Sequence, residues 1–119
     1  LGTEVGAIVK SLVFLADGEV VLALVAGDKR ADGGRLAAAV GSREARIARA
    51  VEVKERTGFA IGGVPPVGHN TPLPAYLDED LLGYPEVWAA GGTPRALFRA
   101  TPKELLALTG AQVANLKEG

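Results

Sequence analysis

The chain has 119 residues, a length typical of one domain, and 48% of them are hydrophobic, which is enough for one packed core. The absence of cysteine excludes disulfides, thiolate nucleophiles and Cys-ligated zinc, and a single histidine excludes a metal site with two histidine ligands. No window approaches the roughly 20 apolar residues of a membrane span. We therefore predict a cytoplasmic protein without membrane contact.

The charge is uneven along the chain, although the formal net charge is only −1. Residues 28–56 hold eight Lys or Arg against five Asp or Glu, a net of +3, and the remaining residues hold five against nine, a net of −4. Any contact with RNA must therefore use a local basic patch and have modest affinity. A solvated helix face is the alternative interpretation of the same stretch.

The first elements form a predicted β-hairpin. Residues 8–16 and 19–26 are apolar runs of strand length, and Asp17-Gly18 between them is a tight-turn signal. Both strands are nearly continuous in apolar residues, which indicates that the pair is largely buried. Lys10 interrupts the first strand in the middle of its apolar run.

Short elements follow the hairpin after a polar loop. A helix is predicted over residues 35–40, and a second helix over residues 51–56, each ended by a glycine. Residues 45–50 fit a strand or a helix, and periodicity does not decide between them. Residues 59–61 are predicted to form a short strand.

The segment GGVPPVGHNTPLP, residues 62–74, contains three glycines and four prolines, so no regular element can run through it. The prolines make it a shaped loop rather than a flexible one. Its glycines let a ligand approach the backbone and leave N–H groups free to point at that ligand. The loop is not a nucleotide triphosphatase phosphate loop, because no Gly-Lys-Ser or Gly-Lys-Thr follows it.

The last part of the chain reads as short strands and one helix. Thr101 caps that helix, Pro102 suits its first turn, Glu104 completes a capping box, and Gly110 ends it. The strands are predicted over residues 73–77, 86–90, 96–100 and, less regularly, 112–116. Together the elements predict a single mixed α+β domain over residues 1–119, with a curved, barrel-like mixed sheet flanked by short helices.

Several polar residues are candidates for chemistry, each with a plainer alternative. Lys10 either snorkels from a buried strand to the sheet edge or holds a phosphate or an anionic transition state in a cleft. His69 is a general acid or base, or a residue that hydrogen-bonds the loop in place, and we favour a structural or substrate-contacting role. For the acidic trio of residues 78–80, we favour a solvated turn over a site that binds a hard cation.

Four segments carry a resemblance to a known family. They are IVKSLVF, TGFAIGGVPPVGH, LPAYLDEDLL and TPKELLALTGA, in this order. The set resembles the YbaK-like proteins and the related editing domains associated with prolyl-tRNA synthetase, over essentially the whole chain. The resemblance implies an α/β domain with a curved mixed sheet that hydrolyses the ester between a wrong amino acid and the 3′ end of tRNA, such as alanine or cysteine on tRNA(Pro).

The resemblance also implies a site and its partners. Lys10 matches the family's lysine near the terminal adenosine and its phosphate, and Gly62 to Pro66 matches the family's Gly-x-x-x-P loop, whose backbone contacts the substrate. The partner is the aminoacylated acceptor end of tRNA, and neither a metal nor another cofactor is expected. We predict Lys10, Gly62 and Gly63 as catalytic, and as substrate-binding residues Ser11, Pro65, Pro66, Gly68, His69, Gly91 and Gly92.

This mechanism needs little side-chain machinery. An aminoacyl ester is already activated, backbone N–H groups can stabilise the tetrahedral oxyanion, and water or a group of the substrate can attack. Selectivity comes from a small pocket that excludes the larger correct amino acid. The alternative is a non-catalytic module of the same fold that binds tRNA ends or a nucleotide.

The chain differs from the family at two places, one that concerns the amino acid removed and one that concerns the pocket wall. Cysteinyl-specific relatives carry a serine and an aspartate that align with Ala90 and Leu97, which cannot play the same polar roles, so we do not assign cysteine specificity. Relatives also have a longer segment before the Lys10 strand, whose helices form part of the pocket wall. We expect that segment of the family to be missing from this chain, which begins at Leu1.

Overall fold

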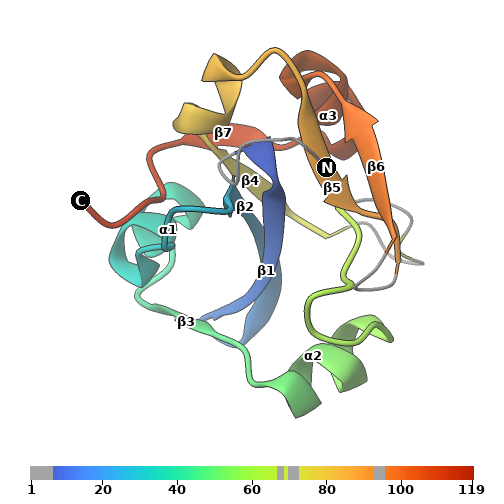
Figure 1. Ribbon diagram of the computed structural model, residues 1–119. Helices are drawn as coiled ribbons and strands as arrows, with labels where there is room; N and C mark the ends of the chain where they lie inside the picture. Colours follow the sequence, from blue (N-terminus) through green and yellow to red (C-terminus); the bar gives the residue numbers. More distant parts are fainter. Residues whose placement is uncertain (1–6, 67–68, 70–72, 93–95) are drawn as a thin grey trace.

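The computed structural model describes residues 7–66, 69, 73–92 and 96–119 (Figure 1). The described strands form a five-stranded sheet in the order β3-β1-β2-β4-β7 and a two-stranded sheet of β5 and β6. The elements in chain order are β1 (Val9–Ala16), β2 (Glu19–Ala26), α1 (Gly33–Val40), β3 (Ala45–Ile47), α2 (Ala50–Thr57), β4 (Ala75–Asp78), the 3₁₀ helix η2 (Glu79–Gly83), β5 (Val87–Ala90), β6 (Leu97–Ala100), α3 (Pro102–Thr109) and β7 (Gln112–Ala114). No described helix is long and apolar enough to cross a membrane.

The predicted hairpin is confirmed as β1 and β2, which pair antiparallel along their full length. Asp17 (φ 49°) and Gly18 (φ 86°) both adopt the left-handed conformation that a tight hairpin turn requires. The Asp17 carboxylate also accepts backbone N–H groups of Arg43 (3.0 Å) and Glu44 (3.1 Å). The turn is therefore tied to the segment that leads into β3.

Side chains of the large sheet alternate between two covered faces. On one face, Val13 and Leu22 pack against Val53 of α2 and against Val64 of the loop over residues 62–74, which we call the glycine loop. Farther along the same face, the sheet packs against β5 and α3. On the other face, Phe14 and its neighbours pack against α1 and the C-terminal segment. Figure 1 shows α1 on one side of the sheet and β5, β6 and α3 on the other.

The mixed α+β class is confirmed, but the described sheet is open rather than barrel-like. β1 pairs antiparallel with β2 and β3, whereas β4 pairs parallel with β2 and β7. The edge strands β3 and β7 have three residues each. Each edge therefore ends after a few ladder pairs and is too short to wrap around and close.

The structure decides the conformation of two segments in the middle of the chain. Residues 45–50 form the short strand β3 and then enter α2. The strand predicted over residues 59–61 is wrong: the segment is a bend and a turn. The Phe59 N–H donates to Thr57 Oγ1 (3.1 Å) and the Gly63 N–H donates to the Ala60 carbonyl (2.9 Å), so local hydrogen bonds replace a strand ladder.

One member of the acidic trio, Asp78, differs from the prediction of a solvated turn. Asp78 is fully buried. Its carboxylate accepts the backbone N–H groups of Leu116 (2.8 Å) and Asp80 (3.2 Å) and lies 3.9 Å from the Lys117 ammonium. Asp78 is thus an internal acceptor that joins β4 to the C-terminal segment. No group of three His, Asp or Glu side chains suited to a metal occurs within the described residues.

A close approach at Gly33 gives a stability prediction. A Cβ atom on Gly33 would lie 2.5 Å from the Ala45 carbonyl oxygen, which is backbone and cannot rotate away. We expect Gly33→Ala to lower the free energy of unfolding by about 2 kcal/mol, measured by urea denaturation, because α1 must move off β3. Gly83→Ala is the matched control, since nothing lies within 4 Å of its added Cβ. Equal stability of the two variants would contradict this packing.

Candidate functional site

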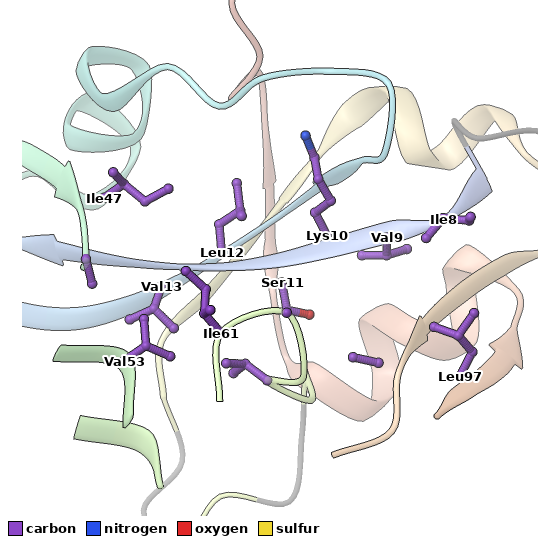
Figure 2. Close-up of a pocket in the computed structure, with 14 residues that line it drawn as sticks. Ile8, Val9, Lys10, Ser11, Leu12, Val13, Ile47, Val53, Ile61 and Leu97 are labelled. Carbon is purple, nitrogen blue, oxygen red and sulfur yellow. The ribbon is translucent and has the colours of Figure 1, made fainter. Parts of the chain in front are cut away.

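A hollow of about 370 Å³ lies along β1, between β3 and α2 on one side and the ends of β5 and β6 on the other (Figure 2). We call it the main hollow. Its lining residues are Ile8, Val9, Lys10, Ser11, Leu12, Val13, Ile47, Ala48, Val53, Ile61, Gly62, Val64, Ala90 and Leu97. Lys10 and Ser11 carry the polar side chains of this lining, and the other members are apolar or glycine.

The main hollow exists because one edge of β1 is left open. β3 pairs with β1 only at Phe14–Ala16, the Ala48 N–H donates to the Val13 carbonyl (2.9 Å), and Ile8 forms an isolated bridge with Trp88. Between these contacts, no described strand pairs with the outer edge of β1. Because backbone groups alternate along a strand, the N–H and C=O of Ser11 face the same side as the Val13 carbonyl. They therefore face the open edge.

The Ser11 side chain is an unsatisfied polar group at this edge. Its Oγ is buried and has no hydrogen-bond partner among the described atoms. A buried hydroxyl without a partner costs free energy, and most such groups in proteins are paired. A ligand in the main hollow can supply the missing partner.

Lys10 points to the opposite face of β1 from Ser11, as expected for neighbours on a strand (Figure 2). Its Nζ donates a hydrogen bond to the carbonyl of Lys29 in the loop between β2 and α1. The side chain is half-buried. The contact with Lys29 fits the snorkelling interpretation, and Lys10 is also one of the residues that line the main hollow.

The predicted glycine loop contributes only part of itself to the main hollow. Gly62 lines it, is exposed and has a left-handed backbone (φ 85°). Gly63 is buried, and its N–H already donates to Ala60. Of the two glycines predicted to be catalytic, Gly62 is the one that lines the main hollow.

The other described residues of the glycine loop that were predicted to bind substrate do not line the main hollow. Pro65 and Pro66 are buried and do not line the main hollow. The Nε2 of His69 lies 2.8 Å from the Pro65 carbonyl, and its ring meets Phe59 edge-on with centroids 5.5 Å apart. These contacts hold the loop in place, so this geometry favours the structural role for His69. Gly68 lies outside the described residues.

The predicted glycine pair after β5 borders the main hollow without lining it. The Gly91 N–H donates to the Ala96 carbonyl (2.7 Å), which joins the ends of β5 and β6. Gly92 has a left-handed backbone (φ 107°) and lies close to Phe59. The neighbouring residues Ala90 and Leu97 do line the main hollow.

Several lining residues were missed by the sequence analysis. Ile47 of β3 and Ile61, which precedes the glycine loop, are each 54% exposed and line the main hollow. Val53 of α2 closes its inner wall. No local sequence pattern identifies these residues as one site, because they are far apart along the chain. Only the packing of α2 and the loop on β1 brings them together.

Comparison with known proteins places the chain in a family. A family model described as an aminoacyl-tRNA editing domain matches residues 1–108. An Enterococcus faecalis protein named EbsC, a candidate Cys-tRNA(Pro)/Cys-tRNA(Cys) deacylase, is 30% identical over 118 residues, which cover 98% of this chain and 71% of that protein. The proline–tRNA ligase of Maridesulfovibrio salexigens is 40% identical over 91 residues, which cover 76% of this chain and 15% of the ligase.

A solved structure agrees with these sequence relatives. It is described as a candidate trans-editing enzyme for prolyl-tRNA synthetase, and it superposes with a TM-score of 0.92 at 74% identity. The match covers 99% of this chain and 74% of that chain. The chain, with its open β1 edge and its glycine loop, therefore belongs to the family of aminoacyl-tRNA editing domains.

Proposed function

We propose that the chain is a trans-editing deacylase that hydrolyses the ester of a mischarged tRNA, with tRNA(Pro) carrying alanine as its preferred substrate. Aminoacyl-tRNA hydrolysis is the activity class of the family. The observation that carries the proposal is the main hollow itself, in which the unpaired Ser11 hydroxyl and an open strand edge face a small apolar space. An aminoacyl group of modest size suits that combination.

The chemistry follows from the groups at the open edge. A water molecule adds to the ester carbonyl and loses a proton, and the bond from the carbonyl carbon to the ribose oxygen then breaks. The ribose oxygen leaves with a proton, and the free amino acid departs. Backbone N–H groups beside the hollow, such as those of Ser11 and Gly62, are suited to stabilise the oxyanion, and the Lys10 ammonium adds a positive charge at the same edge.

The lining favours alanine over cysteine. The positions of Ala90 and Leu97 offer no hydrogen-bond partner to a thiol, and Val13, Val53 and Val64 are apolar as well. A hydrophobic pocket discriminates by size, roughly 10- to 200-fold for one methylene. Proline is larger than alanine and is the correct amino acid on tRNA(Pro), so exclusion by size protects the correct product. The names of the relatives support tRNA(Pro) as the RNA.

A non-catalytic binding module of the same fold is the second candidate. The observation in its favour is that two predicted catalytic donors are already engaged, Lys10 with the Lys29 carbonyl and Gly63 with Ala60. Such a module binds tRNA ends and leaves the ester intact.

A hydrolysis panel separates the two candidates. The chain is incubated with tRNA(Pro) carrying alanine, cysteine, serine or proline, and release of the amino acid is followed under single-turnover conditions. We expect alanine to be released at least tenfold faster than proline. Retention of all four esters at the uncatalysed rate, together with measurable RNA binding, would establish the binding module. Faster release of cysteine than of alanine would refute the preference derived from Ala90 and Leu97.

A further inference from the structure

A second hollow, of about 390 Å³, lies on the other face of β1. Lys10, Leu12 and Ile47 line both this hollow and the main hollow, so the two lie next to each other at the open edge of β1. The lining of the second hollow is Lys10, Leu12, Phe14, Arg30, Ala31, Gly33, Ala45, Arg46, Ile47 and Glu118. A ligand longer than one aminoacyl group can thus extend from the first space into the second.

The two hollows differ in charge. The main hollow contains one cation, Lys10, and no carboxylate. The second hollow contains three cations, Lys10, Arg30 and Arg46, against one carboxylate, Glu118. A ligand that spans both must therefore be small and mostly apolar at one end and anionic at the other.

The arginines of the second hollow are held differently. Arg46 donates to both carboxylate oxygens of Glu52 (2.9 and 2.8 Å), which fixes the direction of its guanidinium. This hydrogen bonding raises the pKa of Arg46 and holds the pKa of the Glu52 carboxyl well below its usual range. The Arg30 side chain is 84% exposed, and its Nε lies 3.8 Å from the Glu118 carboxylate, a loose pair. Arg30 can therefore exchange Glu118 for another anion at little cost.

We propose that the second hollow binds the phosphate backbone of the unpaired 3′ end of tRNA, next to the terminal nucleotide whose ester lies in the main hollow. This inference rests on the proposed function, since the aminoacyl end sets the direction of the RNA. A phosphodiester is the anion that follows an aminoacylated ribose along the chain, and guanidinium groups bind it with charge-assisted hydrogen bonds. Arg30 contacts the phosphate directly, and Glu118 competes with it.

Binding of RNA hairpins tests this assignment. Hairpins that copy the acceptor stem, with and without the unpaired 3′ end, are titrated with the chain by fluorescence anisotropy at several salt concentrations. For the hairpin with the unpaired end, we expect Arg30→Gln to weaken binding about tenfold and to reduce the slope of log K against log salt by about 0.7. Glu118→Gln is expected to strengthen binding two- to threefold, because it removes the competing anion.

The controls isolate the site from general charge. Arg43→Gln removes another exposed arginine, in the turn region near Asp17, and is expected to bind as the wild type does. The hairpin without the unpaired end should bind the wild type and Arg30→Gln equally. Equal affinities of wild type and Arg30→Gln for the complete hairpin would overturn the assignment, and so would absence of binding by the wild type.

Kinetics separates failure of this inference from failure of the proposed function. Arg30→Gln is expected to raise KM about tenfold for alanyl-tRNA(Pro) and to leave hydrolysis of alanyl-adenosine, which has no phosphate, unchanged. Unchanged KM for the tRNA would overturn the second-hollow assignment while deacylation stands. If neither ester is hydrolysed but the hairpin still binds through Arg30, the proposed deacylase fails and the phosphate site stands.

Discussion

Replacing Lys10 by methionine is expected to lower kcat/KM for deacylation of alanyl-tRNA(Pro) about 100-fold, the loss typical of one group that stabilises developing negative charge. Methionine keeps most of the apolar stem along β1 and removes the ammonium. Lys10 lines both hollows at the open strand edge, so loss of its charge is expected to affect both the ester site and the proposed phosphate site. We therefore expect losses in both kcat and substrate binding.

Single-turnover release of alanine measures this effect, with a thermal melt to verify the fold. Lys103→Met is the matched control, because Lys103 is an exposed lysine of α3 that lines neither hollow. A rate for Lys10→Met equal to that of the control would remove Lys10 from the site. It would leave the snorkelling interpretation, in which the ammonium serves only to bond the Lys29 carbonyl.

Replacing Asp78 by alanine is expected to lower the free energy of unfolding by about 3 kcal/mol, a large fraction of the stability of a domain of this size. The substitution leaves the buried N–H groups of Leu116 and Asp80 without their acceptor and the Lys117 ammonium without its buried partner. Leu116 itself is fully buried, so the C-terminal segment cannot move out to hydrate its N–H without exposing core.

Urea denaturation measures this loss, and two variants bracket it. Asp78→Asn retains a carbonyl oxygen for the Leu116 N–H and is expected to cost less than Asp78→Ala. Glu79→Ala removes an exposed partner of the same Lys117 and is expected to cost at most about 0.5 kcal/mol. If Asp78→Ala and Glu79→Ala were equally stable, the buried acceptor role of Asp78 would be wrong.

Family membership and the two hollows support different parts of the conclusion. The match to the editing-domain family and to a close structural relative gives the class of reaction. The apolar lining at Ala90 and Leu97 supports the choice of amino acid, and the cations Arg30 and Arg46 support the path of the RNA.

Local chemistry was enough to predict several elements from the sequence. Asp17-Gly18 between two apolar runs predicts the hairpin, because few other residues accept two left-handed positions in succession. Thr101 and Glu104 form the predicted capping box of α3, with N–H to oxygen distances of 3.1 and 2.9 Å. The resemblance of the ordered motifs likewise predicted the family, since those segments lie in the parts of the chain that build the hairpin, the loop and α3.

Tertiary structure decided what depends on neighbours far along the chain. Burial of Asp78 needs the C-terminal segment to lie across β4. The turn at residues 59–61 is different, because its hydrogen bonds to Thr57 and Ala60 are local. Strand periodicity predicts that Lys10 and Ser11 point to opposite faces of β1. That an open edge separates two hollows there follows only from where β3 stops pairing, which no local pattern encodes.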